Sequence, residues 1–235
     1  MVKKYQLACI QASIEVIDDL ADRDAVIARN VERGLNIAES AVVRDEAKVI
    51  VFPEAWLQGF NHTRSTTDWQ NICIEIPGPE TAKIGEFAKQ HQIYVAAAAF
   101  ERDPGWPEVW FTTGFIVGPS GDVELRYRKI HDHNVEGLIP STSPADVHSA
   151  YTKRYGEESL FPVLDTPYGR LAMMIEHDMN FFELSRVLTF HGAEIILHPT
   201  AEDNGPMVQA LNQARRSRAY ENFIYLASAN AGAIV

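Results

Sequence analysis

The chain has 235 residues, of which 46% are hydrophobic and 23% charged, as in an ordinary globular protein. This composition excludes a disordered tail, a collagen-like fibre and a disulfide-stabilised miniprotein. The 32 acidic and 21 basic side chains give a formal net charge of −11. We therefore expect no nucleic-acid partner, because phosphate binding needs clustered Lys and Arg.

The two cysteines, Cys9 and Cys73, provide neither a disulfide framework nor the spacing of a metal site. Few cysteines and no disulfide framework are typical of a protein from a reducing compartment. The N-terminal apolar run is too short for a signal peptide, and nowhere do about 18 apolar residues run together. We expect a soluble cytoplasmic protein with no membrane contact. Because no linker-like stretch divides the chain, we expect one domain over residues 1–235.

Apolar runs of strand length alternate with helical patterns, which predicts a layered α/β domain. Strands are expected at residues 5–12, 48–52, 93–100, 110–117, 123–127, 161–164, 171–175, 193–198 and 223–229. Helices are expected at residues 22–43, 80–90, 180–191 and 207–221. Residues 131–159 are polar and lack clear periodicity, which indicates a long functional loop.

Glu54 follows the continuous apolar strand 48–52, so it lies at the carboxyl end of a strand that is buried on both faces. Partial desolvation there raises a carboxyl pKa and favours a role as a general base. A carboxylate paired with a neighbouring cation is the alternative. Lys129 follows another strand and could stabilise a developing oxyanion in a dry pocket, or could be a solvated surface lysine.

Four groups of short segments, in this order and spacing, resemble the carbon–nitrogen hydrolase family, also called the nitrilase superfamily. They are residues 51–54 (VFPE); 127–130 (YRKI); 175–178 (IEHD) with 182–186 (FELSR) and 192–199 (GAEIILHP); and 218–222 (RAYEN) with 229–232 (ANAG). The resemblance implies a four-layer α-β-β-α sandwich. It also implies homodimers or higher homo-oligomers that join through their helical faces.

The resemblance further implies hydrolysis of a small amide, carbamoyl compound or nitrile, with acyl transfer to a cysteine and without a cofactor or metal. Residue by residue, it assigns the general base to Glu54 and the oxyanion-stabilising lysine to Lys129. Val135-Glu136-Gly137 matches the segment that carries a second glutamate in aliphatic amidases. Glu136 is thereby a candidate, although it could equally be an ordinary acidic loop residue.

The nucleophile position departs from the family pattern. Where the family has Ile-Cys-aromatic-Asp, this chain has Ile175-Glu176-His177-Asp178. Attack by a carboxylate on an amide would form an anhydride while expelling a poor leaving group, and carboxylate nucleophiles succeed at glycosyl and phosphoryl centres. We therefore expect the chain to be inactive or severely impaired as an amide hydrolase. Cys9 and Cys73 are expected to be buried structural thiols rather than substitutes.

Several alternatives remain open at this point. The substitution could be a deliberate inactivation or natural divergence, and the atypical His177 and Phe181-Phe182 favour divergence. The chain could be a catalytically silent homologue that acts as a ligand-binding or regulatory subunit. A carboxylate-based hydrolase of an activated substrate is a third possibility, and it would form a covalent adduct at Glu176.

The predicted pocket gathers three glutamates, at positions 54, 136 and 176, around Lys129, so at least one should hold or share a proton near neutrality. Glu176 could reach Lys129 and mimic a bound carboxylate product. Trp56, Phe60 and His177 are candidate substrate-binding residues, with core packing an equal alternative for the two aromatic residues. Members of the family usually continue past the ANAG segment, so further C-terminal strands and a tail are expected to be missing here.

Overall fold

The first sheet is built from the N-terminal half of the chain. The computed structural model describes residues 4–132, 141–202 and 205–235. In spatial order, this sheet contains β1 (Gln6–Cys9), β3 (Ala47–Val51), β4 (Tyr94–Arg102), β5 (Trp110–Val117) and β6 (Val123–Arg128). The first three strands run parallel, and β5 and β6 complete the sheet as antiparallel neighbours.

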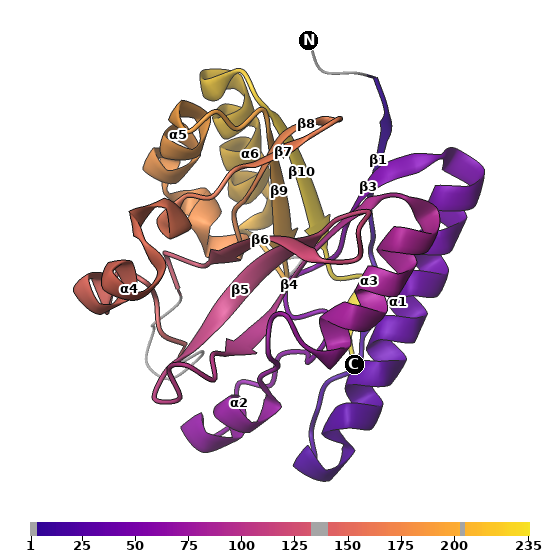
Figure 1. The fold of residues 1–235 in the computed structure, drawn as a ribbon, viewed down its shortest axis with the longest axis vertical. Coiled ribbons are helices and arrows are strands. Elements are labelled where there is room, and N and C mark those ends of the chain that lie inside the picture. The colour runs from indigo at the N-terminus through magenta and orange to yellow at the C-terminus, as the bar shows by residue number, and fades with distance from the viewer. Residues whose placement is uncertain (1–3, 133–140, 203–204) are drawn as a thin grey trace.

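The connections explain this mixture of directions. Parallel strands need a crossover, and α1 (Arg23–Asp45) and α3 (Pro79–His91) provide two of them. A tight reversal between β5 and β6 requires Gly121, whose φ of +95° lies in the left-handed region. Figure 1 shows α1 and α3 lying together on the outer side of this sheet.

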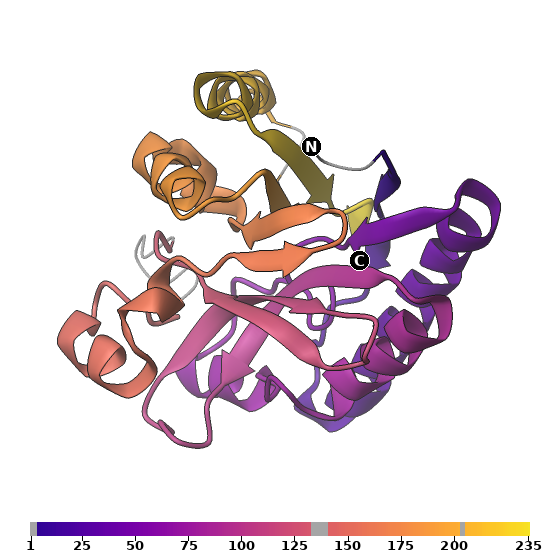
Figure 2. The ribbon, with the colours of Figure 1, turned by 45° about the horizontal axis from the view of Figure 1, so that its top comes forward.

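The second sheet is built from the C-terminal half and has the order β10-β9-β8-β7. Its strands are β7 (Leu164–Thr166), β8 (Gly169–Met173), β9 (Ile195–Thr200) and β10 (Tyr225–Asn230). The helices α5 (Phe182–Phe190) and α6 (Val208–Asn222) connect its parallel strands and lie on its outer side (Figures 1 and 2). A short pair, β2 (Ser13–Ile14) with β11 (Ala233–Ile234), joins the two ends of the chain.

Side-chain alternation divides the interior into two cores. On β3, Val49 and Val51 belong to the core that also contains residues of the second sheet, while Ile50 belongs to the core beneath α1 and α3. Successive strand residues point to opposite faces, so a continuous apolar strand serves both cores. The layers are therefore helix, sheet, sheet and helix, which confirms the predicted α-β-β-α sandwich.

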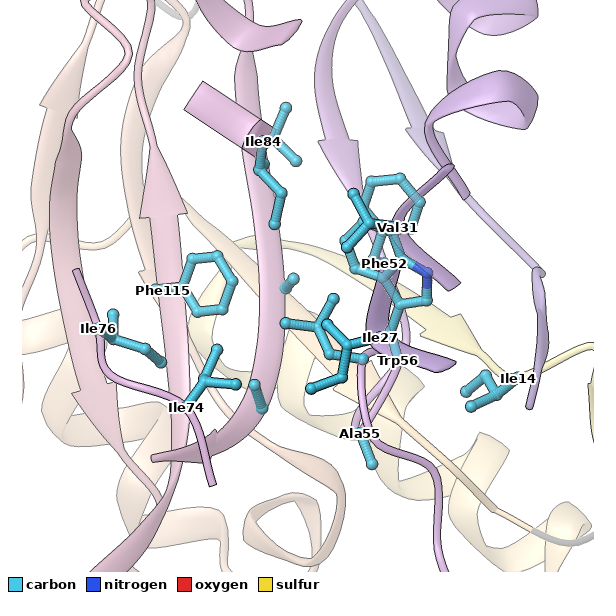
Figure 3. Close-up of a cluster of buried hydrophobic side chains, with 14 of the residues drawn as sticks. Ile14, Ile27, Val31, Phe52, Ala55, Trp56, Ile74, Ile76, Ile84 and Phe115 are labelled. Carbon is cyan, nitrogen blue, oxygen red and sulfur yellow. The ribbon is translucent and has the colours of Figure 1, made fainter. Parts of the chain in front are cut away.

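Trp56 lies in the helix-side core, which Figure 3 shows in close-up. Its ring stacks on Phe52 with centroids 3.7 Å apart, and its Nε1 donates to the backbone oxygen of Asn30 at 3.0 Å. The close approach requires Gly34 on α1, because a Cβ there would lie 2.4 Å from Cζ2 of the indole. The indole therefore fixes the distance between α1 and the first sheet.

Some predicted elements were wrong. Residues 131–159 are not one long loop, because α4 (His148–Tyr155) forms within them, followed by a 3₁₀ helix at Glu157–Leu160. The helix α2 (Thr66–Ile72) was not predicted either. The helix expected at 180–191 is present as α5, but the 3₁₀ helix at Glu176–Asn180 before it was not predicted. Such short helices depend on tertiary contacts more than on their own periodicity.

Contacts with the first sheet explain α4. The Arg128 guanidinium lies 4.4 Å from the ring centroid of Tyr155 and 5.7 Å from that of Tyr151. Arg128 is buried and also pairs with Glu101 and Asp103.

Among the described residues, no helix is both long and apolar enough to cross a membrane.

Candidate active site

The centre of the site is the Lys129 ammonium, which follows β6 and is almost completely buried. Its Nζ lies 2.9 Å from Oε1 of Glu54 and 3.0 Å from Oε2 of Glu176. A third carboxylate, that of Asp132, lies 4.0 Å away. The structure thus brings together three of the residues that the sequence singled out, at positions 54, 129 and 176.

Backbone contacts with both sheets hold these side chains. The amide of Lys129 donates to the backbone oxygen of Thr112 on β5 at 2.8 Å. The amide of Glu54 donates across to the oxygen of Thr200, at the end of β9 in the second sheet, at 3.3 Å. The site therefore lies where strand ends of the two sheets meet.

Burial dominates the electrostatics of this cluster. It raises the pKa of Glu54 to about 8, because the nearby Lys129 ammonium only partly offsets desolvation and the Glu176 carboxylate adds repulsion. Desolvation alone would lower the pKa of Lys129, but the carboxylates of Glu54 and Glu176 outweigh it and raise that pKa above its ordinary value. Near neutrality, Lys129 is charged and Glu54 holds a proton. That at least one carboxyl group of the cluster holds or shares a proton stays a prediction.

Glu176 occupies a strained position in the backbone. It begins the 3₁₀ helix just after β8, and its φ of +37° lies in the left-handed region. A non-glycine residue there costs on the order of 1–3 kcal/mol and persists only where surrounding contacts enforce it. One such contact reaches its backbone oxygen, which lies 3.1 Å from Nε2 of His198.

Asp178 joins the lysine segment to the turn that carries Glu176. Its fully buried carboxylate accepts from the Tyr127 hydroxyl at 2.7 Å and from the amides of Ile175 at 3.0 Å and His131 at 2.9 Å. The His131 ring also stacks on Phe181, with centroids 3.8 Å apart. The relative positions of residues 129 and 176 thus depend on one carboxylate.

One proposed substrate contact is corrected. Trp56 is fully buried in the helix-side core, and Phe60 packs against that core with its ring edge-on to Phe100 at 5.5 Å. Core packing, the alternative for both, therefore describes Trp56, whereas Phe60 is only partly buried and its substrate contact stays a prediction. His177 lies next to Glu176, and its Nδ1 is 2.9 Å from Nδ2 of Asn180. Glu136 lies outside the described residues.

The cysteines lie elsewhere, and one expectation about them was wrong. Cys73 is buried as expected, with its thiol donating to the Trp69 oxygen at 3.2 Å. Cys9 is exposed on β1, although surrounding atoms still raise the pKa of its thiol to about 11 through desolvation. The edge position of β1 explains the exposure. In the described part of the chain, no group of three His, Cys, Asp or Glu residues is arranged to hold a metal ion.

Sequence reasoning did not select Asp132 or His198 as site residues. Asp132 could have been noticed because it lies three residues after Lys129 in a segment rich in charge. His198 stands in an otherwise apolar strand (IILHPT), where a buried imidazole needs hydrogen-bond partners. That mismatch with its surroundings is the signal that could have identified it.

Sequence comparison finds similarity along nearly the whole chain. The model of the carbon-nitrogen hydrolase family matches residues 6–234. Human omega-amidase NIT2 is 30% identical over 229 residues, which cover 96% of this chain and 74% of that protein. The formamidase of Bacillus cereus strain Q1 is 30% identical over 233 residues, covering 97% of this chain but only 63% of the formamidase.

Structural comparison gives the same fold. The nitrilase-superfamily protein Nit3 of Saccharomyces cerevisiae superposes with a TM-score of 0.74 at 20% identity, covering 96% of this chain and 74% of Nit3. A mutant amidase from Nesterenkonia sp. AN1, solved in complex with butyramide, gives a TM-score of 0.71 at 20% identity. That superposition covers 96% of this chain and 76% of the amidase.

Proposed function

The chain belongs to the carbon-nitrogen hydrolase family, and we propose that it is an amidase-type member in which Glu176 replaces the nucleophile and abolishes most or all hydrolysis. In this proposal, Glu54 and Lys129 are the retained base and oxyanion-stabilising cation. The substrate class is a small amide, carbamoyl compound or nitrile. The names of the similar proteins, an omega-amidase and a formamidase, support the amide class.

The observation that carries the proposal is the 3.0 Å contact between the Glu176 carboxylate and Lys129 Nζ. An ammonium stabilises a developing oxyanion only if that oxygen can approach it. Here a permanent carboxylate already lies beside the ammonium, as the carboxylate of a hydrolysed acid product would. A substrate carbonyl must therefore displace Glu176 or bind elsewhere.

The proton balance also opposes turnover by the unsubstituted chain. In the cysteine mechanism, the base accepts the thiol proton as sulfur attacks the carbonyl carbon, and the proton then leaves with the amine when the C–N bond breaks. With a pKa raised to about 8, Glu54 suits the role of proton acceptor, but the unsubstituted chain has no thiol at position 176 to supply the proton. Attack by Glu176 itself would form an anhydride, which is higher in energy than a thioester.

The exposed fractions of the side chains indicate how a ligand would enter. The side chain of Glu176 is 17% exposed, whereas those of Lys129 and Glu54 are 1% and 2% exposed. Glu176 is thus the most accessible of the three groups. A shorter side chain at position 176 would remove the carboxylate that lies 3.0 Å from Lys129 Nζ.

The test compares ammonia release by the unsubstituted chain, Glu176→Cys and Glu176→Ala, using butyramide, formamide, carbamoyl compounds and nitriles. We expect activity in Glu176→Cys alone, because only cysteine supplies a nucleophile. A double variant, Glu176→Cys with Lys129→Met, is the control and should lose that activity. Ammonia release by the unsubstituted chain, or a substrate-derived mass adduct on Glu176, would overturn the proposal.

A silent ligand-binding subunit is the second candidate, because the chain retains a buried Glu54–Lys129 pair without a thiol at position 176. Calorimetric titration with the same compounds distinguishes the two candidates. Binding by the unsubstituted chain without turnover in any variant favours the binding role. Turnover that appears in Glu176→Cys favours a disabled hydrolase.

A further inference from the structure

His198 is a buried histidine for which the family resemblance assigned no role. It lies on β9 opposite Ser228 on β10, and its Nδ1 is 2.8 Å from the Ser228 hydroxyl oxygen. On the other side of the ring, Nε2 lies 3.1 Å from the backbone oxygen of Glu176. The imidazole therefore links the second sheet directly to the strained residue at the centre of the site.

These partners determine which ring nitrogen carries hydrogen. A backbone oxygen can only accept, so Nε2 must be the donor and Nδ1 is left to accept from the Ser228 hydroxyl. Burial and, to a smaller extent, the Arg215 guanidinium together lower the pKa of His198 to about 4. The carboxylates of Glu202 and Glu176 oppose this effect without reversing it. At neutral pH, the ring is therefore a neutral donor of fixed orientation.

The hydrogen bond acts on a rigid unit. The peptide that follows residue 176 is planar, so fixing its carbonyl oxygen also fixes the direction of the His177 amide, which points the opposite way in a trans peptide. Residue 176 has a φ of +37°, a conformation that its surroundings must maintain. The same backbone conformation sets the direction of the Cα–Cβ bond of residue 176, whose carboxylate lies 3.0 Å from Lys129 Nζ.

We infer that His198, oriented by Ser228, is a positioning residue that holds the peptide after residue 176 and thereby directs the side chain at position 176 toward Lys129. It touches neither substrate nor reacting atoms. The inference rests on the proposed function only in treating residue 176 as the reacting position. The geometry itself does not depend on turnover.

The test follows the position of residue 176 by the reactivity of a cysteine thiol introduced there. In a chain carrying Cys9→Ser and Glu176→Cys, the new thiol would lie beside Lys129, where a neighbouring ammonium lowers a thiol pKa. The rate of alkylation by iodoacetamide is measured between pH 5 and pH 9, with the labelled site identified by mass spectrometry. Cys73 is buried and should not contribute.

Two replacements for His198 have side chains of similar volume but differ in whether they can donate a hydrogen bond. His198→Gln can place an N–H near the Nε2 position, whereas His198→Leu cannot. We expect His198→Gln to stay within about twofold of the parent rate, and His198→Leu to lose roughly tenfold at pH 6.5, with the thiol pKa shifted toward its ordinary value. His148→Gln, at an exposed position on α4, is the matched control and should leave the profile unchanged.

An unchanged alkylation profile in His198→Leu would overturn the inference, even if its melting temperature fell, because His198 would then only pack. Equal losses in His198→Leu and His198→Gln would also overturn it, because the donor would not matter. Should His198→Leu fail to fold, Ser228→Ala still tests the inference, with an expected loss of about threefold. In the unsubstituted chain, ¹⁵N NMR should find the hydrogen on Nε2 of His198, and hydrogen on Nδ1 would contradict the inference.

Failure of the proposed function gives a different result. If Glu176→Cys releases no ammonia but its thiol shows the His198-dependent profile, the positioning role stands and the hydrolase proposal falls. If Glu176→Cys releases ammonia but its alkylation profile does not change when His198 is substituted, the positioning role is wrong and the hydrolase proposal stands.

Discussion

The carboxylate of Glu176, at the start of the 3₁₀ helix that follows β8, lies 3.0 Å from the ammonium of Lys129, which follows β6. Glu54 lies 2.9 Å from the same ammonium. One cation thus lies between two carboxyl groups from different parts of the chain in a place with little access to water. Breaking such a cluster at one member leaves charges that neither solvent nor protein can compensate.

Replacing Lys129 should therefore affect stability as well as any chemistry. Lys129→Met keeps the length of the side chain but leaves the carboxyl groups of Glu54 and Glu176 without their cation. We expect the free energy of unfolding to fall by about 3–5 kcal/mol at pH 7, the usual result of removing one partner from a buried pair. Urea unfolding measures it, with the exposed Lys153→Met as control. Equal stability of the two variants would show that the cluster is solvated.

Stability should also depend on pH through Glu54. Its pKa is raised from 4.5 to about 8 in the folded chain, so between these values the folded state keeps a proton that the unfolded state has released. The stabilising contribution is fully present below pH 4.5 and is lost as pH rises through 8, with a slope of about 1.4 kcal/mol per pH unit for one proton.

Glu54→Gln keeps an oxygen near Lys129 and cannot titrate. Its stability relative to the unsubstituted chain should therefore increase as pH rises from 5 to 8, then level off. Urea unfolding at each pH measures this difference, and the exposed Glu108→Gln controls for the loss of a charge. A difference that stays constant with pH would contradict the raised pKa of Glu54.

Asp178 provides a third test, because it accepts from several donors at once. In Asp178→Asn, one acceptor oxygen becomes an NH2 group, so either the Tyr127 hydroxyl and the Ile175 amide, which share one oxygen, or the His131 amide at the other oxygen loses its acceptor. We expect a loss of roughly 1–3 kcal/mol in the free energy of unfolding, the cost of leaving buried donors unsatisfied. Thermal unfolding measures it, and Asp165→Asn on exposed β7 should have little effect. Similar melting temperatures for both variants would show that Asp178 is replaceable.

The layered fold could be predicted because its strands and long helices carry clear patterns. Residues 48–52 form an unbroken apolar run, which is the pattern of a strand covered on both faces, and β3 has that environment. The convergence of Glu54 and Lys129 followed from family motifs rather than from periodicity. No local pattern relates two residues that are 75 positions apart.

The rest depends on tertiary contacts that sequence patterns do not encode. Trp56 follows Glu54 by two residues, yet it belongs to the helix-side core because Gly34 leaves room for the indole there. α4 forms where Tyr151 and Tyr155 can pack on the buried Arg128. The exposure of Cys9 follows from the edge position of β1, which only the order of strands reveals.

The last prediction concerns the two native thiols. Desolvation raises the pKa of Cys9 to about 11, so at pH 8 its thiolate fraction is roughly 100-fold below that of an unperturbed thiol and its reaction with Ellman's reagent should slow accordingly. Cys73 is buried and should react only after unfolding. In the folded chain we therefore expect one slowly reacting thiol, which Cys9→Ser removes, and in urea two. Any ammonia release by the unsubstituted chain should survive this modification. If it were lost together with the Cys9 thiol, the reacting group would be Cys9 and the site built around Lys129 would be wrong.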